Sequence, residues 1–137
     1  MAAGTHGPES KMKRQIQRFA IAGVVGFTVD ASVLFLALLG GLGYLAGRLV
    51  SFLAAAYVTW QINRRFAFRG SRKEKSHGQW WRYLVVMALG GGLNFAVYCA
   101  VVHVLGHSTV FILLAAAAGS GAAMVMNFSA AKWWVFK

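Results

Sequence analysis

The 137-residue chain is short of acidic residues, cysteine and proline. It has three acidic residues, one cysteine and one proline, and only 12% of its residues are charged, against about a quarter in a typical soluble domain. A single cysteine, Cys99, excludes an intramolecular disulfide and indicates no thiolate metal site. Hydrophobic residues make up 58% of the chain, more than a soluble domain of this size can bury. A soluble enzyme with an aqueous cleft is therefore excluded, and lipid is the expected solvent.

Four apolar stretches are each close to the roughly 20 residues that a helix needs to cross the hydrocarbon core. We expect an all-α integral membrane protein with four transmembrane helices, at about 19–39, 45–62, 83–105 and 110–128. Residues 1–17 are predicted to form a disordered basic tail, and residues 69–81 a polar cytoplasmic linker. The long apolar first stretch, which follows a polar and basic start, is expected to be an uncleaved span and not a signal peptide.

Fourteen Lys and Arg residues give the chain a formal charge of +11. These cations lie in three blocks that flank the predicted spans, whereas a nucleic-acid-binding domain would gather them on one folded face. The loops at 40–43 and 106–109 contain no Lys or Arg, so the positive-inside rule predicts that both termini are cytoplasmic. All five tryptophans fall at predicted cytoplasmic ends of spans, where indole rings favour the headgroup layer. Nucleic acid is not an expected partner.

The two halves of the chain resemble one another. A shift of 64 residues places Gly26 on Gly90 and Asp30 on Asn94, and a shift of 68 places Thr59 on Asn127. Residues 18–68 and 82–137 are therefore predicted to be two-helix repeats. Because each repeat contains an even number of spans, the two repeats are expected to be parallel.

Two charged residues within predicted spans are the strongest functional candidates. Asp30 lies about 18 Å along its helix from Arg18, near the middle of the bilayer, where an unpaired carboxylate is costly. Arg48, about 24 Å from Arg64 along the second span, comes within about 6 Å of the depth of Asp30. The two side chains could form a buried ion pair, or Arg48 could receive a phosphate group in bidentate geometry. Alternatively, Arg48 reaches the outer headgroups and has no further role.

Smaller polar residues suggest a path through the membrane. Thr59, Asn94 and Asn127 lie on small-residue faces that either pack helices together or offer hydrogen bonds to sugar hydroxyls. At the cytoplasmic boundary Arg64, Arg65 and Lys132 lie near tryptophans, an arrangement that either binds a lipid phosphate or only sets the topology. His103 and His107 have helical metal-ligand spacing, but no carboxylate or thiol accompanies them, so no metal is expected. No catalytic triad, phosphate loop or carboxylate pair is present, and we expect no enzymatic activity and no cofactor.

Taken together, these motifs resemble the GtrA-like family of small bacterial membrane proteins over about residues 18–137. The resemblance depends on Arg18-Phe19, Val29-Asp30, Asn63-Arg64-Arg65-Phe66-Ala67-Phe68, Arg82-Tyr83, Asn127-Phe128 and Lys132-Trp133-Trp134-Val135-Phe136. Ala131 and Lys132 stand where the first repeat has Asn63 and Arg64, so the second boundary site is expected to bind a headgroup less well.

The resemblance implies a role in cell-surface polysaccharide or glycolipid synthesis, in the bacterial cytoplasmic membrane. Its members are thought to move polyprenyl-phosphate-linked sugars between leaflets. On this hypothesis the phosphate contacts are Asn63, Arg64, Arg65 and Lys132 inside and Arg48 outside, and the sugar contacts are Asp30, Thr59, Asn94 and Asn127. A homodimer is expected, because four helices enclose a glycolipid headgroup poorly.

Two other functions are compatible with the sequence. The first is a non-transporting scaffold that anchors a polyprenyl-phosphate glycosyltransferase through the basic linker. The second is a proton-coupled exporter of cations, which Arg48 disfavours because a nearby cation stabilises the charged form of Asp30.

Overall fold

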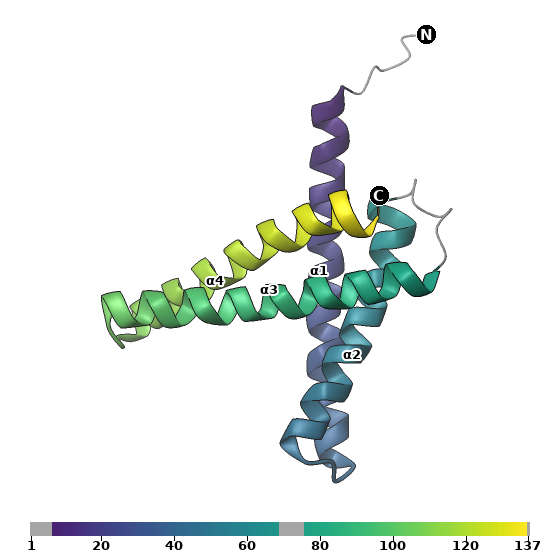
Figure 1. The fold of residues 1–137 in the computed structure, drawn as a ribbon. Helices are drawn as coiled ribbons and strands as arrows, with labels where there is room; N and C mark the ends of the chain where they lie inside the picture. Colours follow the sequence, from purple (N-terminus) through teal and green to yellow (C-terminus); the bar gives the residue numbers. More distant parts are fainter. Residues whose placement is uncertain (1–6, 69–75, 137) are drawn as a thin grey trace. The chain divides into compact units, whose positions relative to one another are not determined.

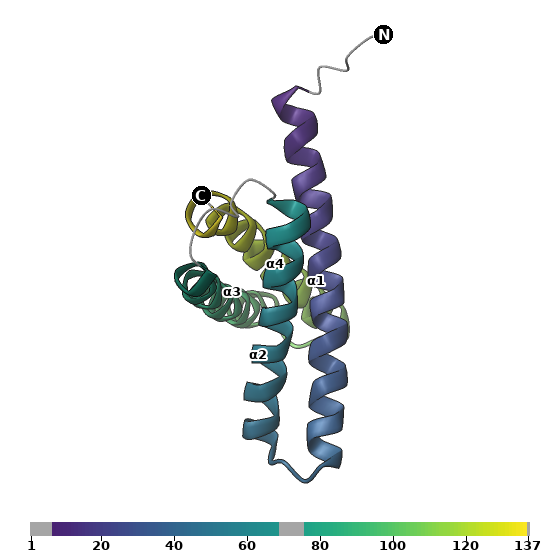
Figure 2. The same cartoon turned by 90° about the vertical axis from the view of Figure 1, so that its right-hand side faces the viewer.

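The computed structural model describes residues 7–68 and 76–136, which form two compact units. Each unit is a hairpin of two antiparallel helices (Figures 1 and 2). Hairpin one consists of α1 (Pro8–Leu39), α2 (Tyr44–Ile62) and the π-helical turn η1 (Asn63–Ala67). Hairpin two consists of α3 (Ser76–Leu105), α4 (Thr109–Ala130) and the π-helical turn η3 (Ala131–Val135). The ends joined by the short loops are called the turn ends below, and the opposite ends the open ends.

The predicted fold class is confirmed. Within the described residues every regular element is helical, and four helices are long and apolar enough to cross a membrane. Helices are the expected solution in lipid, because they satisfy their own backbone hydrogen bonds. The chain is therefore a multi-pass membrane protein. The side of the membrane on which the termini lie, and the parallel arrangement of the repeats, stay predictions.

Two helices begin earlier than the sequence predicted. α1 starts at Pro8, so residues 8–17 are helical and the prediction of a disordered tail over 1–17 is wrong for them. α3 starts at Ser76, so residues 76–81 of the predicted linker belong to a helix. Proline suits the first helical turn, and once a span has nucleated a helix, adjoining Lys, Met, Arg and Gln residues extend it at little cost. Residues 1–6 and 69–75 lie outside the described part of the chain.

Glycines close both turn ends. Gly41 (φ +87°) follows α1 and Gly106 (φ +100°) follows α3 in the left-handed region, which glycine adopts without steric penalty. Ser108 caps the N-terminus of α4, and its hydroxyl accepts a 3.4 Å hydrogen bond from the Phe111 amide. These short connections force the two helices of each hairpin to run side by side.

Close approach of small residues holds the helices together. A Cβ at Gly26 would overlap the Thr59 methyl group, and a Cβ at Gly90 would overlap the Asn127 side chain. The two contacts correspond under the 64- and 68-residue shifts. Hairpin two has a further contact, in which Gly119 of α4 packs against the side chain and the backbone of Asn94 in α3. Small residues at such points let helix backbones approach in lipid, where the hydrophobic effect does not drive helices together.

The open ends of the two hairpins are also built alike. Phe19 meets Phe68 edge to face, with ring centroids 6.4 Å apart, and Tyr83 meets Phe136 at 5.9 Å. Arg18 Nη1 donates to the Phe66 carbonyl at 2.8 Å, and Arg82 Nη2 donates to the Val135 carbonyl at 3.5 Å. In each hairpin a basic-aromatic pair in the first helix therefore closes onto the π-helical turn that ends the second.

Gly119→Ala is expected to destabilise the protein by about 1–3 kcal/mol, because the added methyl group would meet the Asn94 backbone, which cannot move aside cheaply. Gly121→Ala is the matched control, since nothing lies within 4 Å of a Cβ at that position. Unfolding of the full chain in mixed detergent–SDS micelles measures both. Equal stability of the two variants would contradict the packing described here.

Candidate functional site

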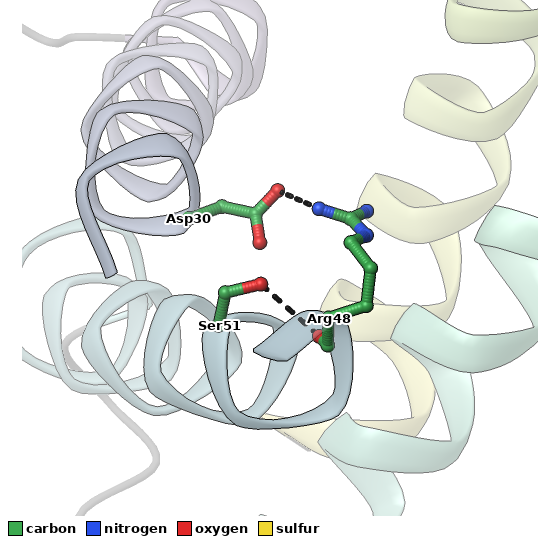
Figure 3. Close-up of polar contacts among 3 residues, drawn as sticks. All are labelled: Asp30, Arg48 and Ser51. Atoms are coloured by element: carbon green, nitrogen blue, oxygen red, sulfur yellow. Dashed lines mark hydrogen bonds and ion pairs between the residues drawn. The ribbon is translucent and has the colours of Figure 1, made fainter. Parts of the chain in front are cut away.

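Asp30 and Arg48, which were expected at similar depth, form an ion pair within hairpin one, one of the alternatives that the sequence left open. Arg48 Nη1 lies 2.7 Å from Asp30 Oδ2, joining α2 to α1 (Figure 3). Arg48 lies one turn into α2, and the antiparallel hairpin brings it level with Asp30. Asp30 is the only acidic residue and Arg48 the only Lys or Arg in the predicted spans. Their contact neutralises two charges that would otherwise be costly in lipid.

The two members of the pair differ in exposure. The Arg48 side chain is 45% exposed on the surface of the hairpin, whereas that of Asp30 is 21% exposed. Asp30 Oδ1 is buried and has no hydrogen-bond partner in the described part of the chain. Ser51, which is fully buried, points into the same space between α1 and α2, and its hydroxyl donates to the Arg48 carbonyl at 3.0 Å (Figure 3). The face that the site presents outward is therefore the guanidinium.

Hairpin two has no counterpart of this charged pair. The positions equivalent to Asp30, Arg48 and Ser51 are Asn94, Ala116 and Gly119. Here Asn94 packs directly against Gly119, so the space that holds Ser51 in hairpin one is closed by backbone. Between Tyr83 and Ala131 the sequence contains no Asp, Glu, Lys or Arg. The only charged site within a span therefore belongs to hairpin one.

The other three predicted sugar contacts do not join the pair. Thr59 is 8% exposed, its methyl group packs on Gly26, and its hydroxyl donates within α2 to the carbonyls of Ala55 and Ala56. Asn94 and Asn127 lie between α3 and α4, packed on Gly119 and Gly90. These placements favour helix packing, the alternative weighed for these residues from sequence. Contact with a sugar stays a prediction for all three.

The predicted phosphate contacts at the open ends are divided between the two hairpins. Arg64 lies over the Trp60 ring, 5.4 Å from its centroid, and Lys132 lies 5.4 Å from the centroid of Trp133. Such distances suit cation–π attraction. Arg65 is exposed, but Asn63 is only 1% exposed, so its side chain faces the interior of hairpin one. The cations can meet a headgroup directly, whereas Asn63 is placed to support the turn.

Sequence reasoning missed the π-helical turns and the arginines that close on them. Arg18 and Arg82 bond to carbonyls in η1 and η3, and so tie the turns that carry Arg64 and Lys132 to the first helix of each hairpin. The basic-aromatic pair that starts each repeat was the only sequence feature that pointed to these arginines. Their bonds to distant carbonyls could not be predicted, because a contact between residues far apart in the sequence leaves no periodic pattern. π-helical turns are frequent at functional sites.

In the described part of the chain no three His, Cys, Asp or Glu side chains come together. His103 and His107 are both exposed. The charged site therefore presents an exposed guanidinium that is held by a less exposed carboxylate, an arrangement suited to binding an anion.

The Asp30–Arg48 pair is expected to show coupling of about 1–3 kcal/mol in a double-mutant cycle. Arg48→Gln leaves a carboxylate alone in the span and should destabilise more than Asp30→Asn, after which Arg48 can still extend toward headgroups. The double variant should be more stable than Arg48→Gln, as measured by SDS unfolding.

Arg65→Gln combined with Asp30→Asn is the control for this cycle, because Arg65 lies in η1, at the open end of the hairpin and far from Asp30, and should give additive effects. Additive effects of the Asp30 and Arg48 substitutions would contradict the ion pair.

Comparison with known families gives one match. The family model described as "GtrA/DPMS, transmembrane domain" matches residues 18–136, which include hairpin one from Arg18 onward, the whole of hairpin two, the charged pair and both π-helical turns. Among curated proteins none matches the chain. Because the family match covers most of its length, the protein belongs to the GtrA/DPMS transmembrane-domain family, and so has a role in the synthesis or translocation of glycosyl-lipids or polysaccharides.

Proposed function

We propose that the protein moves polyprenyl-phosphate-linked sugars from one leaflet of the membrane to the other. The observation that carries the proposal is the Asp30–Arg48 pair, which is partly exposed on the surface of hairpin one within an apolar span. Charged groups at such a depth are costly, and they mark the pathways of substrates or ions. A carried lipid with an anionic headgroup matches the exposed guanidinium of this pair.

The chain offers cations at two depths along hairpin one. Arg64 and Arg65 lie at the open end, and Arg48 lies 16 residues away in sequence, about 24 Å along the helix. A guanidinium binds phosphate in bidentate geometry, so each site suits the phosphate of the carried lipid. The isoprenoid tail would stay in the hydrocarbon while the headgroup moves between the two sites. Lys132 supplies a single cation at the open end of hairpin two.

We further propose how the protein is oriented in the membrane and that it forms a homodimer. The open ends face the cytoplasm of a bacterial cell, in accord with the positive-inside rule, and the protein catalyses no covalent reaction. A second copy completes the enclosure of the headgroup. Glycines with open space beside them, such as Gly23 and Gly91, could allow close contact between helices of two copies.

Reconstituted full-length protein should flip a short-chain polyprenyl-phosphate sugar across liposomes, whereas Arg48→Ala should lose this activity and Asp30→Asn should flip more slowly. Outer-leaflet access of the sugar is followed over time. Thr28→Val is the matched control in α1, because the Thr28 hydroxyl already bonds within its own helix, to the Val24 carbonyl, and its loss should leave flipping intact.

Full flipping by Arg48→Ala would contradict the proposed path. No flipping above the level of empty liposomes, with folded protein and several sugars, would contradict translocation and favour the scaffold for a glycosyltransferase. That scaffold should then fail when Arg72, Lys73 and Lys75 of the linker are reversed in charge.

A further inference from the structure

We propose that Asp30 competes with the phosphate of the carried lipid for Arg48, and so sets how readily the lipid is released. This inference rests on the proposed function and gives Asp30 a different role from the sugar contact predicted from sequence. Asp30 is then a positioning residue that acts through Arg48.

The geometry leaves Arg48 free to take a second anion. A guanidinium has five N–H donors, and in the described part of the chain the guanidinium of Arg48 bonds only to Asp30 Oδ2, through Nη1. The side chain is nearly half exposed, and Figure 3 shows the guanidinium projecting beyond the carboxylate. A phosphate that arrives along the surface of hairpin one therefore meets N–H groups directly.

Asp30 is poorly placed to bind the sugar itself. Its Oδ1 is buried, and its Oδ2 is occupied by Arg48. A sugar hydroxyl would have to displace the arginine or open the hairpin to reach either oxygen. The carboxylate is instead well placed to hold Arg48 when no lipid is bound, and to repel a bound phosphate, since two anions would then share one cation.

The consequence is an exchange of partners at one guanidinium. With no lipid present, Asp30 neutralises Arg48 and removes much of the cost of a lone cation in the span. A phosphate that binds the remaining N–H groups shares the cation with Asp30 and repels it, so the pair weakens and the affinity for the phosphate is lowered by the interaction that is lost. When the phosphate leaves, Asp30 restores the pair and lowers the barrier to release. Hairpin two, with Asn94 and Ala116 at the equivalent positions, has no such exchange.

The test is equilibrium binding of a short-chain polyprenyl-phosphate sugar to the full-length protein in nanodiscs, with flipping measured on the same preparations. Asp30→Asn should bind this lipid at least about tenfold more tightly, because the substitution removes a negative charge beside the bound phosphate. It should also flip the lipid more slowly. Asp30→Ala should shift binding in the same direction. Arg48→Gln should lose most of the binding, and Thr28→Val should match the native protein in both assays.

The outcomes separate this inference from the proposed function. If Asp30→Asn and Asp30→Ala bind as the native protein does, or more weakly, while the native protein still flips the lipid, the competition is wrong and the flipping proposal stands. If the native protein neither binds nor flips the lipid, both are wrong. Should Arg48→Gln bind normally, the phosphate site is elsewhere and the inference fails.

Discussion

A carboxylate and a guanidinium placed inside an apolar span must neutralise one another, and hairpin one is arranged to meet that requirement. Gly41 turns the chain so that α2 runs back along α1, and Arg48, one turn into α2, comes level with Asp30. Gly26 and Thr59 hold the helices at a fixed separation further along. Ser51 occupies the space beneath the pair, where Gly119 of hairpin two meets backbone instead. The pair, the turn and the close packing depend on one another.

Comparison of the two hairpins separates what the fold needs from what the site adds. Both hairpins share a glycine turn, a close contact at Gly26 or Gly90, an aromatic pair at the open end and a π-helical turn closed by an arginine. These features make a two-helix unit in lipid. Only hairpin one adds a charged pair, whereas hairpin two brings α3 and α4 together through Asn94 and Gly119. The charged groups within the predicted spans therefore all belong to hairpin one.

Much of this architecture could be predicted from the sequence, because it follows from the thickness of the bilayer and the fixed rise of an α-helix. Span length is set by bilayer thickness, so the predicted ends at residues 39, 62 and 105 agree with α1, α2 and α3. The similar depth of Asp30 and Arg48 could be predicted because antiparallel helices of fixed rise place the two charges level, whereas their contact could not be decided from the sequence. The helical start at Pro8 was missed, because a polar, basic segment at the start of a chain is typical of a disordered tail. It is helical here because it extends a helix that the adjoining span has already nucleated.

The details of the site depend on local contacts that no periodic pattern records. Thr59, Asn94 and Asn127 were correctly placed on small-residue faces, but the sequence alone could not decide between packing a neighbouring helix and lining an open path. That choice follows from glycines on the opposite helix, at positions 26, 119 and 90. Likewise, the buried position of Asn63 follows from the π-helical turn, which hydrophobic periodicity does not predict.

The state of the Asp30–Arg48 pair with and without lipid is the most direct test of this account. Asp30 is the only aspartate in the chain, so selective ¹³C labelling of aspartate with ¹⁵N labelling of arginine gives one carboxylate signal in solid-state NMR. In bilayers without ligand, the Asp30 carboxylate carbon should show strong dipolar coupling to guanidinium nitrogen. Saturating polyprenyl-phosphate sugar should remove that coupling. A carboxylate that is uncoupled without ligand, or that remains coupled at saturation, would contradict the account.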